Sequence, residues 1–407
     1  MEAEVLHKKK SLSPKLRFKG FSGGWKKKDL KDFTKINQGL QIAISERFSE
    51  QVDGSLFYIT NEFLRKESKK SYFIKNPPQS VICNEDDLLM TRTGNTGQVV
   101  TGVHGAFHNN FFKIKFDSSC EKWFLYYFLT SYRTQHNILK LAGTSTIPDL
   151  NHSDFYKIKI NIPEYPEQQK IASFLSVVDE KIQQLTSKKE LLEQYKKGVM
   201  QQLFSGKLRF KDENGEAFPK WEEKRLGDVF EFFRGSPISK SDLSETGKYL
   251  CIHYGELFTS YSEVINSIKS KTDLENGFFS IKGDILMPSS DVTPKGLAKA
   301  SSIQLDKVIL GGDMNILRPT INQDSIFFSY LINFNQQKII QKVTGTTVKH
   351  IYNRDVKLLD FNVPNSFDEQ KKIANYLSNI DSKIESVTKQ ISETQTFKKG
   401  LLQQMFV

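Results

Sequence analysis

The chain has 407 residues, with 58 Lys or Arg against 47 Asp or Glu, and so carries a formal net charge of +11. A hydrophobic fraction of 38% with 12% aromatic residues excludes a disordered chain and leaves room for more than one packed domain. The chain has no apolar run of membrane-spanning length, no signal-peptide core and only three scattered cysteines, so we expect a cytoplasmic protein. The positive net charge favours a polyanionic partner.

The first element along the chain is an opening segment that occurs twice. The letters LRFK stand at residues 16–19 and again at 208–211. A Trp and then a Leu follow each copy, at Trp25 and Leu30 and at Trp221 and Leu226. The two copies indicate that the chain contains two related halves.

Short runs rich in β-branched and aromatic residues follow in each half and predict strands. They lie at residues 97–103, 111–116, 155–162, 249–253, 308–310 and 358–363. Helices are predicted over residues 122–141 and 325–343. The globular parts are therefore expected to be mixed α/β.

Polar loops follow two similar apolar segments, DLLM at 87–90 and DILM at 284–287. Two Gly-Thr loops begin at Gly143 and Gly345. Such side chains and backbone N–H groups can donate to phosphates or read base edges, although ordinary surface turns have the same composition. The candidate DNA-binding residues are Arg92, Thr93, Asn95, Thr96, Gln98, Thr144, Ser145, Ser289, Ser290, Lys295, Thr346, Thr347 and Lys349.

A long helix is predicted over residues 167–205, and its sequence recurs at the end of the chain. EQQKIASFL at 167–175 matches EQKKIANYL at 369–377, and the offset of 202 residues holds from Glu167 onward. Apolar residues recur in steps of three and four, which is the heptad pattern of a coiled coil. Lys196 and Lys398 interrupt this apolar seam at equivalent places.

Neither seam can be buried by its own helix, so each needs a partner. Packing of the two helices against each other, in antiparallel orientation, would give the duplicated chain an approximate two-fold axis. The alternative is that each seam packs on its own preceding domain. Between the repeated segments, residues 37–86 and 237–283 show no convincing similarity, so each half combines a constant frame with a variable interior.

Several catalytic motifs are absent or incomplete. The chain contains no GxxxxGK[ST] phosphate loop. Asn76-Pro77-Pro78-Gln79 resembles the Asn-Pro-Pro-aromatic motif of amino-methyltransferases but lacks the aromatic residue and a cofactor loop. Pro148-Asp149 has no Glu-x-Lys partner for a metal nuclease, and His104 and His108 fit loop positions better than a zinc site. The sequence thus predicts neither a catalytic nor a metal site.

Taken together, these segments resemble the DNA-specificity subunit of Type I restriction–modification enzymes. The resemblance rests on the LRF…W…L opening, the Gly-Thr loop, the EQ-x-KIA helix entry and the KKG-x(2)-QQ-x-F helix ending of each half. The frame departs from this pattern at Ile147-Pro148, which has no counterpart in Lys349-His350. The resemblance implies target-recognition domains at 14–165 and 206–366, and spacer helices at 166–205 and 367–407 packed as an antiparallel coiled coil.

The same resemblance implies a bacterial, noncatalytic subunit that reads an asymmetric bipartite sequence in double-stranded DNA. Its implied partners are two methyltransferase (modification) subunits and two ATP-dependent restriction subunits. S-adenosylmethionine, ATP and Mg²⁺ would be bound by those partners and not by this chain. Two rival functions are a standalone DNA-acting enzyme with an unrecognised active site and a coiled-coil adaptor without sequence-specific DNA binding.

Overall fold

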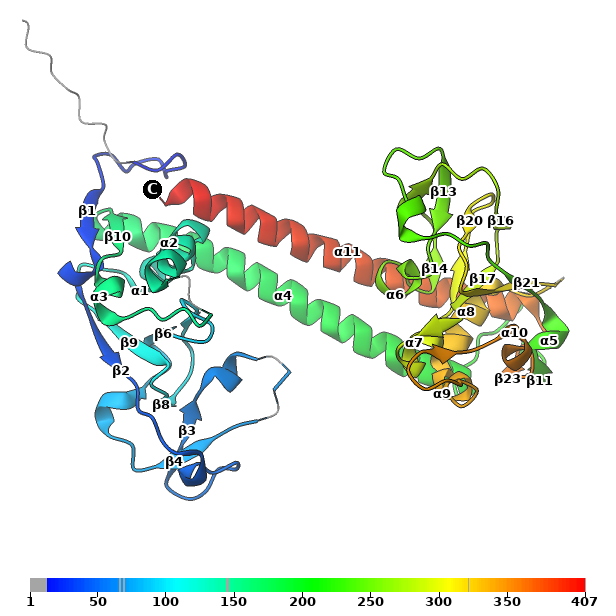
Figure 1. Ribbon diagram of the computed structural model, residues 1–407, viewed down its shortest axis with the longest axis horizontal. Helices are drawn as coiled ribbons and strands as arrows, with labels where there is room; N and C mark the ends of the chain where they lie inside the picture. Colours follow the sequence, from blue (N-terminus) through cyan, green and yellow to red (C-terminus); the bar gives the residue numbers. More distant parts are fainter. Residues whose placement is uncertain (1–12, 66, 69, 144–145, 321, 407) are drawn as a thin grey trace, which may run out of the picture. The chain divides into compact units, whose positions relative to one another are not determined.

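The computed structural model describes residues 13–406 except 66, 69, 144–145 and 321. The chain forms two compact units, residues 1–187 together with 388–407, and residues 188–387. Two long helices, α4 (Tyr165–Phe204) and α11 (Phe367–Met405), each contribute one half to each unit (Figure 1). Each unit therefore contains the start of one long helix and the end of the other.

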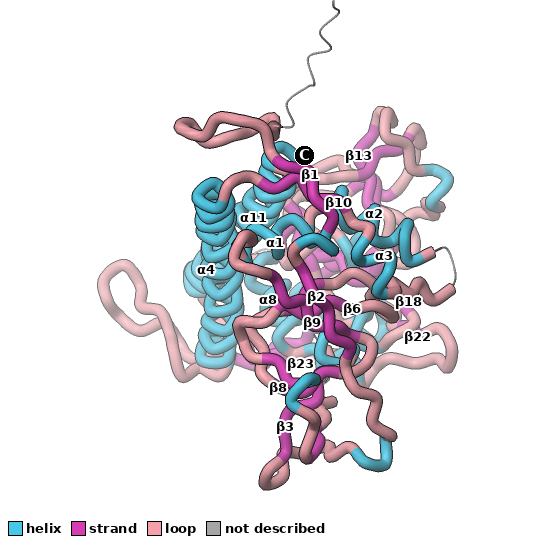
Figure 2. The backbone as a smooth tube through the Cα atoms, turned by 90° about the vertical axis from the view of Figure 1, so that its left-hand side faces the viewer, coloured by secondary structure: helices cyan, strands magenta, loops and turns pink. Residues whose placement is uncertain are grey.

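The first unit combines two four-stranded sheets, a two-stranded sheet and three shorter helices. Its sheets have the strand orders β2-β9-β6-β7, β4-β3-β8-β5 and β1-β10, and Figure 2 shows β2, β9 and β6 side by side. The strands are β1 (Lys26–Asp29), β2 (Thr34–Gln38), β3 (Ser55–Ile59), β4 (Phe73–Lys75), β5 (Ile82–Cys83), β6 (Leu88–Thr91), β7 (Val99–Val100), β8 (Gly105–Phe107), β9 (Phe111–Phe116) and β10 (Lys159–Ile162). The helices are α1 (Lys122–Thr130), α2 (Tyr132–Ala142) and α3 (His152–Tyr156).

The second unit repeats this plan with small additions. Its sheets have the orders β12-β21-β17-β19-β14, β15-β13-β20-β16, β11-β23 and β18-β22. The strands are β11 (Glu222–Arg225), β12 (Phe230–Arg234), β13 (Tyr249–Ile252), β14 (Val264–Ile265), β15 (Ser270–Thr272), β16 (Phe278–Phe279), β17 (Ile285–Pro288), β18 (Ser290–Asp291), β19 (Ser301–Ile303), β20 (Ile309–Leu310), β21 (Met314–Pro319), β22 (Lys349–His350) and β23 (Asp360–Val363). The helices are α5 (Leu226–Val229), α6 (Glu256–Thr259), α7 (Pro294–Leu297), α8 (Ser325–Phe334), α9 (Gln336–Ile340) and α10 (Asn353–Val356).

The interiors with dissimilar sequences have the same topology. In the first unit β3 pairs in parallel with β8, and β4 and β5 complete the sheet in antiparallel pairs. In the second unit β13 pairs in parallel with β20, and β15 and β16 take the corresponding outer places. The backbone plan of the second sheet is therefore retained although its side chains differ.

The repeated DLLM and DILM segments form strands that are buried on both faces. Leu88 and Met90 of β6 pack in the core that contains α1 and α4, whereas Leu89 faces the core of the second sheet. In β17, Leu286 likewise faces away from the core that contains α8 and α11. A strand covered on both faces must be apolar at consecutive positions, which explains why these segments do not alternate with polar residues.

The long helices pack against each other in antiparallel orientation, as predicted. In the first unit the beginning of α4 and the end of α11 share one core, to which Ile171, Leu175 and Leu401 contribute. In the second unit the end of α4 and the beginning of α11 do the same through Leu203 and Leu377. The mixed α/β fold with a paired-helix repeat is thus confirmed.

The lysines that interrupt the seams are paired with acidic residues inside each unit. Lys398 forms an ion pair with Asp179 in the first unit, and Lys196 lies 2.7 Å from Asp381 in the second. A buried tyrosine donates to each aspartate, Tyr127 to Asp179 and Tyr330 to Asp381. At each interruption the charge of the lysine is therefore neutralised by an aspartate inside a polar cluster of the helix interface.

The glutamate and glutamine of the EQ-x-KIA segment connect each long helix to its unit. Arg17 contacts Glu167 through two N–O distances of 2.7 Å. The Gln168 side chain accepts from the Glu121 amide and donates to the carbonyls of Ser119 and Pro163. Arg209, Glu369 and Gln370 make corresponding contacts in the second unit, where Gln370 accepts from the Asp324 amide and donates to Pro364.

Of the strand predicted at 97–103, only Val99–Val100 forms a strand, and three other predicted elements also differ from the structure. The run at 155–162 begins as α3, because Asn151 caps that helix by accepting from the Asp154 amide, and only 159–162 is a strand. The predicted helix at 122–141 is divided at Ser131, whose extended backbone and hydroxyl cap α2. The helix at 325–343 is likewise divided at Asn335, and α9 ends at Ile340.

One glycine in each unit allows the chain to pass between the two sheets. A Cβ atom on Gly39 would lie 2.3 Å from the carbonyl oxygens of both Phe107 and His108, and one on Gly235 would lie 1.8 Å from the Gly311 oxygen. Backbone atoms cannot rotate away from such a contact, so these positions require glycine.

We expect Gly39→Ala to lower the free energy of unfolding of the first unit by about 1–3 kcal/mol, since the added methyl group must displace backbone. The matched control is Gly400→Ala, because a Cβ at this helical position meets no atom within 4 Å. That control is expected to stabilise by about 0.4–1 kcal/mol. Urea unfolding of both variants tests the pair, and equal effects would contradict the assignment.

Candidate nucleic-acid interface

In the first unit, two loops that are distant in sequence meet beyond the end of β6. The Leu150 amide donates to the Arg92 carbonyl at 2.9 Å, and Thr93 forms an isolated bridge with Asp149. The Arg92 amide in turn donates to the Asn110 carbonyl at 2.7 Å. The polar loop after β6 is thus held between the turn before β9 and the segment before α3.

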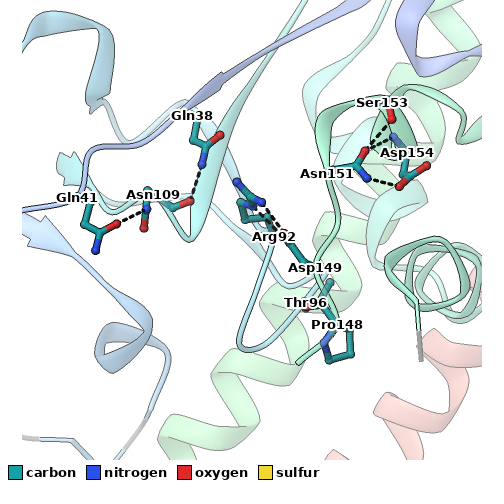
Figure 3. Close-up of polar contacts among 10 residues, drawn as sticks. All are labelled: Gln38, Gln41, Arg92, Thr96, Asn109, Pro148, Asp149, Asn151, Ser153 and Asp154. Atoms are coloured by element: carbon teal, nitrogen blue, oxygen red, sulfur yellow. Dashed lines mark hydrogen bonds and ion pairs between the residues drawn. The ribbon is translucent and has the colours of Figure 1, made fainter. Parts of the chain in front are cut away.

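Arg92 and Asp149 form the central ion pair of this surface (Figure 3). The Arg92 Nε lies 2.8 Å from Asp149 Oδ1, and Nη2 lies 2.5 Å from Oδ2. The guanidinium hydrogen bond lowers the pKa of Asp149, and the carboxylate raises the pKa of Arg92. Both groups therefore stay charged at neutral pH, and part of the donor capacity of Arg92 is already used.

Two glycines set the backbone turn of this loop, and a side-chain hydrogen bond connects it to the segment before α3. Gly94 and Gly97 adopt positive φ angles of 91° and 89°. The Thr96 hydroxyl donates to the Pro148 carbonyl at 2.6 Å. Asn95 and Gln98 have exposed side chains, whereas Thr144 and Ser145 lie outside the described residues.

The second unit brings the corresponding segments together. Ser290 pairs with His350 in the β18–β22 ladder, the Ile351 amide donates to the Ser289 carbonyl, and the Ser289 amide donates to Asp313. Ser289 and Ser290 are only 3% and 9% exposed, so the structure places their hydroxyls largely away from solvent.

The remaining predicted residues of the second unit lie on the surface. Thr346 and Thr347 are exposed at the tip of the Gly345 loop, and the Lys349 ammonium donates to the Gly345 carbonyl at 2.7 Å. Lys295 is exposed on α7, which packs beside β18 and β22. It also borders a hollow of about 580 Å³.

The two loop sites correspond residue by residue, with one shift in register. Leu150 and Ile351 make the same bond to the preceding polar loop, so Pro148-Asp149 occupies the place of Lys349-His350. The offset of 202 residues places Ile147-Pro148 opposite Lys349-His350, which is one residue out of register. The register between the halves therefore changes by one residue between Gly143 and Leu150.

Sequence reasoning missed several polar side chains of the first site. Gln38 ends β2, Asn109 lies in the turn before β9, and Gln41, in the loop after β2, contacts Asn109 (Figure 3). Gln38 and Gln41 belong to the variable interior, and Asn109 lies outside the repeated segments, so no repeat marked any of the three. Asp149 was considered only as part of a nuclease motif, although its position before the Asn151 cap is a signal for an ordered turn.

The described part of the chain offers no group of three or more His, Cys, Asp or Glu side chains suited to a metal ion. Among the described helices, none combines the length and apolar character needed to cross a membrane. The three cysteines are buried and unpaired, and burial raises the pKa of the Cys83 and Cys251 thiols to about 11.

Comparison with protein families decides the classification. The sequence model described as "Type I restriction modification DNA specificity domain" matches residues 22–194 and again residues 219–395. The chain belongs to this Type I DNA-specificity family. Its two matched segments correspond to the two repeats, so the predicted resemblance is confirmed.

The similarity to individual members of this family covers nearly the whole chain. The specificity subunit of the Type I restriction enzyme MjaVIII from Methanocaldococcus jannaschii is 24% identical, over 93% of this chain and 91% of its own length. The crystal structure of the S subunit of a Type I restriction–modification system from M. genitalium has a TM-score of 0.65 at 19% identity, covering 97% of this chain and 99% of that one. A chain from a structural study of complex assembly in a type I R-M system has a TM-score of 0.50 at 16% identity, covering 93% and 96%.

Proposed function

We propose that this chain reads an asymmetric, bipartite sequence in double-stranded DNA, with one part of the sequence bound by each unit. Membership of the DNA-specificity family makes the chain a noncatalytic DNA-recognition component of a Type I restriction–modification enzyme. The observation that supports two different half-sites is that both units share one backbone plan but carry unlike side chains at their loop sites. Identical units would select identical half-sites.

We also propose that the repeated frame binds two copies of one modification subunit, and that two restriction subunits join the complete enzyme. Equivalent surfaces on the two long helices would present the same docking face twice. S-adenosylmethionine, ATP and Mg²⁺ would be bound by those partners, which flip and methylate the target base and translocate DNA. The complex would act in the bacterial cytoplasm.

Expression of the chain with its modification subunits, followed by genome-wide mapping of methylated adenines, tests this proposal. The expected result is one bipartite motif that disappears when the gene for this chain is deleted. Methylation or cleavage by the purified chain alone would support a standalone enzyme instead. Binding that depends on salt but not on sequence would support an adaptor.

Asp149→Asn is expected to strengthen binding to DNA of any sequence and to steepen its salt dependence by about one unit of slope. The substitution releases the Arg92 guanidinium, which can then contact a phosphate and displace a counterion. Filter binding at several salt concentrations measures the slope. Asp154→Asn removes the same charge from α3 without a contact to Arg92, so an equal change in both variants would contradict this role.

A further inference from the structure

Three residues of the first unit have equivalents in the second unit that are identified by backbone hydrogen bonds and not by sequence similarity. Gln38 ends β2 and pairs with Phe112, whereas Arg234 ends β12 and pairs with Asn315. Each is followed by the crossing glycine, after which the Leu40 amide donates to Phe107 and the Ser236 amide to Leu310. Gln38 and Arg234 therefore stand at the same place.

The second correspondence is set by the parallel strand pair. The His108 amide donates to the Ile59 carbonyl at 2.9 Å, and the Gly311 amide donates to the Ile252 carbonyl at 2.9 Å. Asn109 and Gly312 follow these residues and so are equivalent. Arg92 and Ser289 are the third pair, because their backbone carbonyls accept the matched hydrogen bonds from the Leu150 and Ile351 amides.

In the first unit these positions carry linked amides. The Gln38 side-chain Nε2 donates to the backbone carbonyl of Asn109 at 3.3 Å, and the Asn109 side-chain Nδ2 donates to Gln41 Oε1 at 2.8 Å (Figure 3). A carboxamide presents one donor and one acceptor side by side, which complements N6 and N7 of adenine. The fixed Asn109–Gln41 contact orients these amides at the loop surface before any DNA arrives.

In the second unit glycine replaces the asparagine, and a hollow of about 560 Å³ lies at the site. Arg234, Tyr254 and Asp313 border it. Arg234 is exposed, and no carboxylate among the described residues lies within ion-pair distance of it. An unpaired guanidinium fork complements O6 and N7 of guanine, and a carboxylate such as that of Asp313 accepts from N4 of cytosine.

We propose that the first two of these equivalent positions, those of Gln38 and Arg234 and of Asn109 and Gly312, set the bases that the two units read. The amides at Gln38 and Asn109 select an A·T pair in the half-site of the first unit. Arg234 selects a G·C pair in the half-site of the second. This inference rests on the proposed function and specifies which side chains carry it.

The test is selection of binding sequences by the full-length chain from a library of duplex DNAs with randomised positions. For the wild-type chain we expect two preferred segments, one of which contains a required G·C pair. Arg234→Gln is expected to reduce the preference for that pair roughly 5- to 150-fold and to leave the other segment unchanged. Asn109→Ala is expected to relax an A·T position in the other segment only.

Two matched controls and one reciprocal variant complete the experiment. Arg225→Gln makes the same chemical change on the β11–β23 sheet, and Gln183→Ala removes an amide from the exposed side of α4. Both are expected to keep the wild-type sequence. Gln38→Arg is expected to replace the A·T preference of the first half-site by G·C, a gain that loss of folding cannot imitate.

The outcomes separate this inference from the function on which it rests. A wild-type chain without sequence preference would overturn both. A selective wild-type chain whose preferences survive Arg234→Gln, Asn109→Ala and Gln38→Arg would overturn the inference alone. A uniform loss of affinity for all sequences would also overturn it, because Arg234 would then be a phosphate contact.

Discussion

Arg17→Ala is expected to lower the free energy of unfolding of the first unit by about 3–5 kcal/mol, because it leaves a buried carboxylate without its cation. The Glu167 side chain is only 3% exposed and accepts two bonds from Arg17. Without the guanidinium, the Trp25 indole at 3.3 Å is the one side chain among the described residues that still donates to this buried carboxylate. An uncompensated buried charge is costly, whereas the intact pair contributes little net stability.

Urea unfolding combined with hydrogen exchange measures this loss and assigns it to the first unit. The double variant Arg17→Met with Glu167→Gln should recover most of the stability, because it removes both charges. Lys26→Ala is the matched control. The side chains of both Lys26 and its partner Glu164 are exposed, so this ion pair should contribute no measurable stability. A comparable loss in the control, or no recovery in the double variant, would show that the buried charge is not the cause.

Lys196→Leu is expected to destabilise the second unit by about 2–4 kcal/mol, with the value reduced from a fully buried pair because solvent reaches part of the cluster. The ammonium neutralises two carboxylates, Asp381 at 2.7 Å and Glu263 at 3.2 Å. Burial already raises the pKa of Asp381, and Lys196 opposes this rise. Leucine would fill the seam but leave two acids facing each other.

The loss caused by Lys196→Leu should depend on pH in a defined direction. In the variant, the pKa of folded Asp381 rises further above its unfolded value of about 3.9. The folded state then binds more protons than the unfolded state, so the stability of the variant falls as pH rises through this window. The difference from the wild type should therefore be smallest in acid and largest near neutral pH.

Chemical unfolding at a series of pH values tests this expectation. Lys196→Leu combined with Asp381→Asn should remove most of the pH dependence, because the asparagine side chain can still accept from the Tyr330 hydroxyl without carrying a charge. A pH-independent loss in Lys196→Leu would indicate altered packing of the seam as its cause.

The repeated frame could be predicted from the sequence because the same residue types make the same contacts in both units. The heptad spacing predicts both long helices, and the duplication predicts their antiparallel pairing. The lysine interruptions correspond to polar clusters in the structure. The shared topology of the interiors could not be predicted, because a sheet depends on backbone pairing and tolerates many side-chain sets. Only Gly39 and Gly235 mark the crossing, and a single glycine is a weak signal in a sequence.

The candidate site was predicted in part. The two polar loops do meet the segments that follow the Gly-Thr loops, but the pairing of Arg92 with Asp149 required the tertiary structure. The predicted elements at 122–141 and 155–162 do not account for the helix caps Ser131 and Asn151, whose side chains bond to the backbone and interrupt the surrounding pattern. Whether the predicted residues contact DNA stays a prediction.

The division of the long helices between the units also sets an order for folding during synthesis. The second unit is continuous in sequence, from residue 188 to residue 387, and can close its core once that segment has left the ribosome. The first unit needs Leu401 and Met405, which are synthesised after the whole of the second unit. Nascent proteins usually fold from the N-terminus, but here the N-terminal unit must hold its apolar helix face open until the end of α11 has been synthesised.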